Sequence, residues 1–371
     1  MFNSKLPLSV VKFAGTPERV KVYEQFKDYY FNYATEVLGQ KGYMYDKSCS
    51  LAMKNEKVHQ AMLQEIQTLA NCKIPTANEG IDLVQFASHP TLTWATFAVV
   101  NTIIDAIIPD TILKNIGLYT DIKTVPYGQV AQFDIRPNSL MSVSQSSNGK
   151  SRGYAQKQFG KSVSLVPVNH EITVEVSMYA LLSGAISLAE FVTKALISME
   201  KDMTVSAYQA LSALATDGSF PAELRKGTAS VDSAIELCEN VTAINNNSNA
   251  TILGTALAVN KILPSATDGY RISIPGNEIA IDLIKSVLQY PVMRLPQISD
   301  GHKGFVLDNK TIYILSTGVD KIIKGVVEGS TMTFAKDFNM TADLTSSVTF
   351  NKRYAFEAIG NATMGVIAIG S

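Results

Sequence analysis

Two short patterns typical of enzyme sites lie close together in the middle of the chain. Residues 149–153, GKSRG, match the G-x-S-x-G pattern in which a serine is the nucleophile of a hydrolase. That chemistry needs a buried strand before the serine and a helix after it, so that the hydroxyl is exposed at a sharp turn. The flanking residues are polar on both sides. We therefore predict no hydrolase site, and a serine hydrolase using Ser151 stays only as a distant alternative.

The second pattern is a relaxed phosphate-binding loop. Residues 155–162, AQKQFGKS, end in Gly-Lys-Ser but begin with alanine where the first glycine normally stands. A phosphate site of this kind needs a helix directly after the serine, because the helix N-terminus faces the phosphates. Residues 163–168 contain Pro167 and have the composition of a strand. The pattern thus indicates a basic hairpin, and no nucleotide cofactor is predicted.

The histidines and cysteines are too scattered along the sequence to suggest a metal site. They show no ligand spacing, and no carboxylate cluster accompanies them. The cysteines form no C-x-x-C pattern, which favours a reducing compartment. We predict no metal, no cofactor and no enzyme activity. The residues concerned are His59, His89, His170, His302, Cys49, Cys72 and Cys238.

The composition limits the class of function. The 371 residues suffice for two or three domains, and 32 Lys+Arg against 33 Asp+Glu leave a net charge of -1. This balance argues against electrostatically driven nucleic-acid binding, which needs a basic excess. Only 18% of the residues are charged, which favours a surface partly covered by neighbouring chains. The apolar stretch 91–108 contains Asn101 and Asp105, so we predict a buried helix and no membrane span, and residues 1–11 lack a signal-peptide pattern.

The longest irregular segment lies between two predicted strands. Residues 131–135 and 172–176 alternate apolar and polar side chains, as half-buried strands do. The segment between them is rich in Ser, Gly, Asn and Gln, and no acidic residue occurs between Asp134 and Glu171. A loop of this length inside a compact domain is typical of a functional segment. We predict a long hairpin with a basic tip that projects from the body.

Helices are predicted before and after this hairpin. The first ninety residues have helical periodicity, and their aromatic density fits either a core helix or an arm docked on another subunit. The strongest helix signal covers residues 187–215, where Ser187 and Glu190 form a capping box. At 1.5 Å per residue this helix would be about 40 Å long.

The rest of the chain alternates helix and strand signals. Residues 227–330 contain a predicted helix at 230–243 and predicted strands at 251–253, 305–307 and 312–315. The final segment, 347–369, alternates apolar and polar residues as strands do. The sequence therefore predicts an α+β protein with a mixed region after the long helix.

This order of elements resembles the major capsid proteins of tailed double-stranded DNA bacteriophages, which have the Hong-Kong-97-type fold. The resemblance covers about residues 90–371 and includes ATILGT at 250–255 and RYAFEA at 353–358. In that family the hairpin, called the E-loop, reaches over an adjacent subunit. The long helix is the spine of a peripheral domain, and the mixed region is an axial domain.

The resemblance implies a division of the chain. It gives an N-terminal helical arm region at 1–90, a peripheral domain at 91–227 plus 331–371, and an axial domain at 228–330. The peripheral domain holds the E-loop at 127–171 and the spine helix at 187–215. The tip of the E-loop would contact the neighbouring subunit. The implied contact residues are Lys150, Arg152, Lys157, Phe159 and Lys161.

The implied function is that of a structural virion protein that self-assembles into hexamers and pentamers of an icosahedral head. The head would enclose double-stranded DNA without sequence-specific contact, with scaffold, portal and decoration proteins as further partners. The expected location is the virion capsid, assembled in the host cytoplasm. Some relatives form a Lys–Asn isopeptide bond, but no aligned glutamate supports one between Lys161 and Asn351 or Asn361. The start at Met1 argues against removal of an N-terminal segment.

Other functions remain open from the sequence. An encapsulin, a bacterial compartment shell of the same fold that encloses enzymes, would give the same pattern. Its contents would be a cargo protein in place of DNA. An adhesin or tail component would form fibres or small rings.

Overall fold

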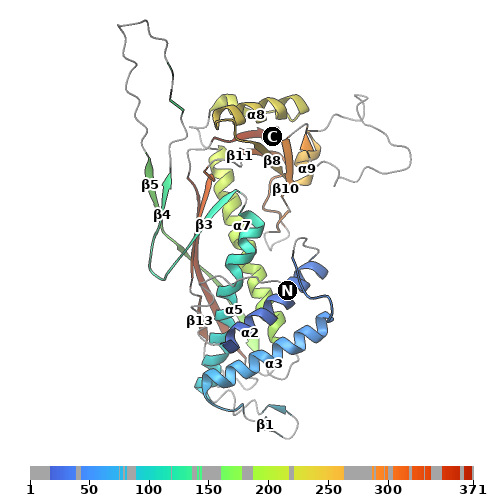
Figure 1. Ribbon diagram of the computed structural model, residues 1–371, viewed down its shortest axis with the longest axis vertical. Helices are drawn as coiled ribbons and strands as arrows, with labels where there is room; N and C mark the ends of the chain where they lie inside the picture. Colours follow the sequence, from blue (N-terminus) through green and yellow to red (C-terminus); the bar gives the residue numbers. More distant parts are fainter. Residues whose placement is uncertain are drawn as a thin grey trace, which may run out of the picture.

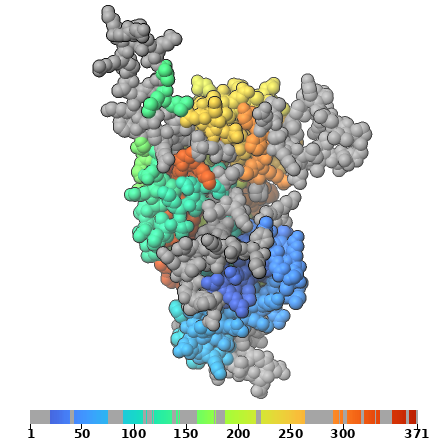
Figure 2. Space-filling model, viewed as in Figure 1, coloured from blue at the N-terminus to red at the C-terminus, as the bar shows by residue number. Residues whose placement is uncertain are grey.

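Two long helices, α5 and α7, run side by side along the long axis of the molecule (Figure 1). The computed structural model describes the following residues: 17–38, 43–74, 76–77, 80–81, 89–117, 119–135, 140–141, 143, 160–177, 187–216, 221–262, 286–287, 290–295, 297–299, 304–316, 320–329, 331–335, 345–359 and 363–369. Figure 2 shows the N-terminal helices at one end of the body and α8 at the other.

The helix α7, Leu188–Thr216, confirms the predicted long helix. Its 29 residues give a length of about 43 Å. The hydroxyl of Ser187 accepts a hydrogen bond from the backbone N–H of Glu190 at 3.3 Å, which satisfies one free donor of the first turn. Glu190 also pairs with Lys194 at 2.8 Å, one turn further along. The helix therefore begins where the capping signal predicted.

The helix α5, Pro90–Ile116, is the predicted buried helix. Its first part, Pro90–Ile108, is long and apolar enough to cross a membrane, but 61% of that window is buried inside the chain. Polar residues in the stretch serve internal contacts. Asp105 accepts hydrogen bonds from the N–H and hydroxyl of Thr331 and pairs with the buried Lys352 at 2.5 Å. This packing is that of a core helix.

The N-terminal helices α2, Pro17–Glu36, and α3, Leu51–Ala70, pack against each other and against α5. The side chains of Phe26 and Tyr30 are fully buried in this layer. Of the aromatic residues that raised the possibility of an arm on another subunit, Tyr29, Tyr30 and Phe31 are thus core residues of their own chain, and Tyr33 is half-buried. Ser50 caps α3, and two two-residue strands, β1 (Thr76–Ala77) and β2 (Gly80–Ile81), follow it.

A five-stranded sheet lies against the other side of α5 and α7. Its strands are β3 (Thr120–Val125), β6 (Val168–Ser177), β12 (Ile323–Glu328), β13 (Met332–Ala335) and β14 (Thr345–Ala358). The long strand β14 pairs antiparallel with β6 on one edge and with β12 and β13 on the other, and β3 runs parallel to β12. Alternate side chains of β14, such as Val348, Phe350 and Tyr354, are buried in the main core.

A second, six-stranded sheet lies at the far end of α7. Its order is β7 (Arg225–Lys226), β15 (Gly365–Ala368), β11 (Thr311–Ser316), β8 (Ala250–Gly254), β10 (Tyr290–Arg294) and β9 (Ser286–Val287). One face, with Ile252 and Ile314, packs with α8 (Val231–Ile244); the other, with Leu253 and Tyr313, belongs to the core of α7. Two covered faces explain why β8 is buried along its length. The short elements η1 (Ala222–Leu224) and α9 (Ala256–Asn260) flank the sheet.

Sheet membership differs from the predicted domain boundaries at three strands. β7, within the range 91–227, belongs to the six-stranded sheet because it pairs with β15. β12, within the range 228–330, belongs to the five-stranded sheet because it pairs with both β3 and β14. β15, within 331–371, belongs to the six-stranded sheet because it pairs with β11 and β7. The chain thus passes between the two sheets more often than the sequence signals indicated, and the division into domains stays a prediction.

One predicted strand is wrong. Residues 305–307 form a single bridge from Phe305 to Ser299, and Phe305 is exposed. The side-chain amide of Gln297 donates to the carbonyl of Leu307 at 2.8 Å and accepts from its N–H at 3.0 Å. Because the Gln297 side chain provides the hydrogen bonds of the Leu307 backbone, residues 305–307 need no partner strand. The remaining described elements agree with the predicted α+β class.

Candidate assembly interface

A two-stranded hairpin stands apart from both sheets and forms the base of the predicted E-loop. Its strands are β4, Ala131–Ile135, and β5, Lys161–Leu165, paired antiparallel from Ala131–Leu165 to Ile135–Lys161. Along β4 the residues alternate between buried and exposed, as the sequence predicted. Among the described strands, none of the sheet pairs joins β4 or β5 to the five-stranded sheet. The hairpin is therefore held to the body by side chains.

A small apolar cluster attaches the hairpin base to the sheet. Ala131, Phe133 and Leu165 pack with Val326 of β12, and all four are buried. The ring of Phe133 also lies under two ammonium groups, with Lys123 Nζ 4.6 Å and Lys324 Nζ 5.7 Å from the ring centroid. A cation placed over a ring face is attracted by its negative potential. The cluster thus combines apolar burial with cation–π contacts.

The two segments that connect the hairpin base to the body both contact the same ion pair, Glu328 and Arg353. The incoming chain turns at Pro126–Gln129, where Gly128 has φ +76°, and the Gly128 N–H donates to Glu328 Oε1 at 2.5 Å. The Glu328 side chain is fully buried, and its Oε2 lies 3.6 Å from Nη1 of Arg353. The other guanidinium nitrogen, Nη2, donates to the carbonyl of Pro167 on the outgoing chain at 3.0 Å. The Glu328–Arg353 pair therefore contacts both sides of the hairpin base, Glu328 on the incoming side and Arg353 on the outgoing side.

The flanks of this hairpin carry exposed apolar side chains, which sequence reasoning missed. The exposed fraction of their side chains reaches 99% at Val143. Isolated exposed apolar residues are ordinary, but a group of them around one hairpin base is typical of a contact surface. The sequence does carry a signal for them: three apolar residues, Leu140, Met141 and Val143, lie close together within a polar segment. The other members are Tyr127, Val130, Val166 and Val168.

Four of the five predicted contact residues, Lys150, Arg152, Lys157 and Phe159, lie outside the described residues, as does Ser151. Lys161 is described: it is the first residue of β5, it is exposed, and it pairs with Ile135. Residues 161–165 are a strand, so the relaxed phosphate-loop pattern has no helix after it. Of the pair considered for an isopeptide bond, Asn351 is in β14 and Asn361 lies outside the described residues.

The metal-ligating residue types do not gather in the described part of the chain. No group of three or more His, Cys, Asp or Glu side chains there is arranged to hold a metal ion. The three cysteines are free thiols, and burial raises the pKa of the Cys238 thiol to about 12. His302 lies outside the described residues, and burial lowers the pKa of His59.

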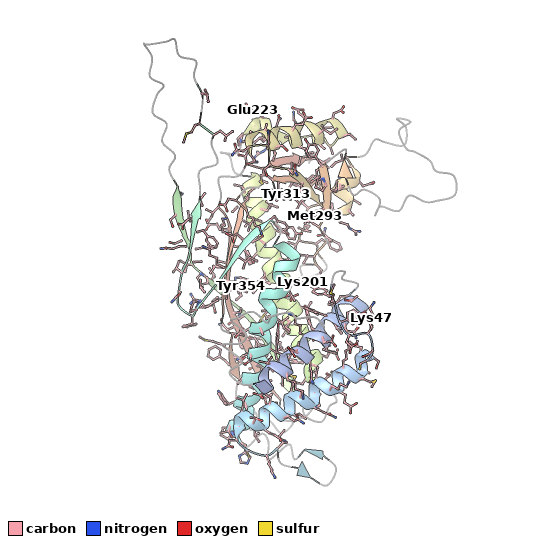
Figure 3. All side chains as sticks on the ribbon, in the orientation of Figure 1. Lys47, Lys201, Glu223, Met293, Tyr313 and Tyr354 are labelled. Carbon is pink, nitrogen blue, oxygen red and sulfur yellow. The ribbon has the colours of Figure 1, made fainter. Side chains whose placement is uncertain are left out.

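One polar cluster joins the sheet to α7 beside an open groove. Tyr354 of β14 and His170 of β6 both contact Asp202 of α7, and Figure 3 shows Tyr354 beside α7 near Lys201. The groove, of about 780 Å³, runs between α7 and the end of β14 and is lined by both polar and apolar side chains, among them Gln209, Leu214 and Phe356. Because Asp202 is shared by both rings, the cluster ties three elements together.

One protein family matches most of this chain in sequence. The family described as "SPbeta prophage-derived putative capsid protein YonB" matches residues 32–368. No curated protein sequence matches significantly.

Solved capsid structures resemble the chain more weakly. The structure described as "Microbacterium phage Oxtober96" is 9% identical, with a TM-score of 0.46 over 67% of this chain and 89% of that one. The acidic stable capsid structure of Helicobacter pylori bacteriophage KHP30 is 11% identical, with a TM-score of 0.47 over 68% and 88%. The capsid of the native GTA particle is 11% identical, with a TM-score of 0.47 over 69% and 90%.

The family match carries the assignment, because it covers nearly the whole chain and includes α5, α7, the hairpin base and both sheets. The chain belongs to this family of prophage-derived capsid proteins, and its function is that of a structural shell protein.

Proposed function

We propose that copies of this chain assemble into hexamers and pentamers, and that these close into an icosahedral phage head around double-stranded DNA. The observation that carries the proposal is the hairpin base: β4 and β5 have no backbone pairing to the described sheets, and their flanks expose apolar side chains. A two-stranded hairpin is marginally stable alone and needs another surface to pack on. A second copy supplies that surface in a ring.

The basic tip gives the contact its charge. Lys150, Arg152, Lys157 and Lys161 lie in a stretch without acidic residues, so the tip would rest on an acidic surface of the neighbouring copy. Phe159 would add apolar contact area beside them. Each such contact can be weak, because a subunit held by several neighbours gains from effective concentration.

Each of the two sheets would form the centre of one domain of the shell protein. The five-stranded sheet with α5 and α7 would form the peripheral domain, the six-stranded sheet with α8 the axial domain at the ring centre, and residues 1–90 a helical arm region. Assembly would take place in the host cytoplasm, with scaffold, portal and decoration proteins as partners. The near-neutral charge suits a wall that holds DNA without reading its sequence.

Electron microscopy of the purified chain, with light scattering on the same sample, tests the proposal. We expect closed particles of a single size class, containing nuclease-protected DNA when isolated from infected or induced cells. A cargo protein inside the shells in place of DNA would favour the encapsulin alternative. Fibres or open rings would contradict a head.

A charge variant tests the hairpin. Replacing Lys150, Arg152 and Lys157 with glutamine removes three positive charges from the tip and should prevent shell closure without unfolding the chain. The matched control replaces Lys47, Lys57 and Lys201, which are exposed on the helical side, with glutamine. Normal shells from the tip variant would show that the basic residues are dispensable.

A further inference from the structure

The hairpin base has two connections to the body, and both contain features that bend the chain. The incoming connection is the turn at Pro126–Gln129, where Gln129 N–H donates to the Pro126 carbonyl at 3.2 Å and Gly128 takes a positive φ. This is the pattern of a type II turn, which favours glycine at its third position. The outgoing connection is Val166–Pro167, between β5 and β6. The direction of the hairpin depends on how these two short segments are held.

The incoming turn is fixed through Glu328. The third residue of a type II turn has a backbone N–H that the turn itself does not use, and here the Gly128 N–H donates to Glu328 Oε1 at 2.5 Å. Glu328 is the last residue of β12, and the next N–H, that of Gly329, donates to the Val125 carbonyl at 2.9 Å. The turn is thus attached to the end of the strand beneath it.

The outgoing segment is fixed through Arg353. Its Nη2 donates to the Pro167 carbonyl at 3.0 Å while its Nη1 lies 3.6 Å from Glu328 Oε2. The Glu328 side chain is 0% exposed, so Arg353 is the cation that compensates a fully buried carboxylate. A guanidinium is planar and spreads its charge over three nitrogens, so one nitrogen can donate to the Pro167 carbonyl while another stays within ion-pair distance of Glu328; a lysine ammonium is a point charge on a flexible stem.

We propose that Arg353 is a positioning residue that fixes the direction of the hairpin base: it pairs electrostatically with Glu328, which bonds the incoming turn, and it donates to the Pro167 carbonyl of the outgoing segment. Without the guanidinium, the two connections are held by separate contacts and the hairpin can swing about the apolar cluster at Phe133. The consequence for shell geometry rests on the proposed function, because the angle of the hairpin then sets the angle between neighbouring copies.

Hydrogen exchange on the full-length chain tests the hinge itself. Arg353→Met removes the guanidinium but keeps an aliphatic stem, and should raise amide exchange at Gly128 about tenfold. Arg353→Lys should give an intermediate rise, because it keeps the charge but cannot hold both acceptors. Glu328→Gln should give a smaller rise than Arg353→Met, since its amide oxygen still accepts from Gly128.

A matched control separates the hinge from a general loss of stability. Arg225→Met removes a guanidinium that donates to the Ala215 carbonyl at 2.7 Å, away from the hairpin. It should leave exchange at Gly128 unchanged, and exchange across β11 should be unchanged by Arg353→Met. The proposed hinge would be wrong if the Arg353→Met variant exchanged the Gly128 amide at the wild-type rate. It would also be wrong if the amides of β11 exchanged faster by the same factor as Gly128.

Particle size tests the consequence for assembly. Arg353→Met shells should show a broadened diameter distribution or fail to close, as measured by electron microscopy, while Arg225→Met shells keep the wild-type diameter. If Arg353→Met raises amide exchange at Gly128 but its shells keep the wild-type diameter, the hinge does not set the geometry of the shell. Failure of the wild-type chain to form shells would count against the proposed function, and the exchange measurement would still decide the hinge.

Discussion

The imidazole of His170 lies flat on the phenol ring of Tyr354, with ring centroids 3.9 Å apart and an interplanar angle of 11°. Both side chains turn to the same carboxylate: His170 Nδ1 lies 3.0 Å from Asp202 Oδ2, and the Tyr354 hydroxyl donates to that oxygen. Burial, and then the hydrogen bond to Asp202, raise the pKa of Tyr354, so its hydroxyl remains a donor. Through this contact the two longest strands are tied to α7.

Removing the hydroxyl of Tyr354 should weaken this tie without opening a cavity. Tyr354→Phe keeps the buried ring and its stacking on His170, and we expect a loss of about 1 kcal/mol in the free energy of unfolding, since Asp202 is half exposed and regains water. Urea unfolding measures the change. The control Tyr127→Phe, at an exposed position, should be nearly neutral. Equal stabilities of the two variants would contradict a stabilising role for the hydroxyl.

A glycine in the middle of β12 makes room for an aromatic ring. A Cβ at Gly325 would lie 2.5 Å from Cε1 and 2.8 Å from Cδ1 of Phe356, and 3.3 Å from a side-chain carbon of Ile122. The ring is rigid and cannot move a single atom aside. Gly325→Ala should therefore lower the free energy of unfolding by roughly 1 to 3 kcal/mol.

Thermal unfolding of a second glycine variant provides the control for this clash. Gly227 has no heavy atom within 4 Å of the position that a Cβ would take. Gly227→Ala should leave the melting temperature within about 2 °C of the wild type, whereas Gly325→Ala should lower it by several degrees. A melting temperature of Gly325→Ala at or above that of Gly227→Ala would mean that the sheet relaxes around the methyl group.

Removing the ring of Phe133 should destabilise the hairpin base more than the body of the chain. The cluster around it contains four buried residues and is separate from the main core, so Phe133→Ala removes most of the apolar contact there together with both cation–π contacts. We expect faster amide exchange across β4 and unchanged exchange across β11. Phe133→Leu keeps apolar volume and should give a smaller increase. Uniformly faster exchange in both strands would place the residue in the global core.

Local signals in the sequence were sufficient for α7 and for the first strand of the hairpin base. The cap at Ser187 and the apolar period after it predicted α7, and the alternation of apolar and polar residues at 131–135 predicted β4, the first strand of the hairpin base. Both signals act within a few residues of the chain, where spacing alone decides the local structure.

Contacts between distant residues could not be predicted in this way. Lys324 is buried although lysine is normally exposed, because Asp121 of β3 and Asp320, just before β12, both pair with it. Arg353 meets Pro167 across 186 positions of the sequence, so no local pattern marks it as part of the hairpin. The strand β12 was missed for the same reason: both its faces are covered, which leaves no alternation to read.

The buried carboxyl of Glu200 should make the stability of the chain depend on pH. Glu200 of α7 accepts a hydrogen bond from the Tyr30 hydroxyl of α2 at 2.9 Å, and it is 5% exposed. Burial raises its pKa to about 7, and the hydrogen bonds from Thr111 and Tyr30 lower it only in part. The unfolded chain ionises this group near 4.5, so between about pH 4.5 and 7 the folded state holds a proton that the unfolded state has lost.

Stability from this group is therefore fully present below about pH 4.5 and is lost as the pH rises through about 7. Glu200→Gln keeps a neutral acceptor at the same place and should remove this dependence. At pH 8 we expect the variant to be more stable than the wild type by up to roughly 3 kcal/mol, and at pH 4.5 nearly equal to it. Urea unfolding at both pH values, with the exposed Glu56→Gln as control, measures the difference. A constant difference between wild type and Glu200→Gln at the two pH values would mean that the carboxyl titrates alike in the folded and unfolded chain.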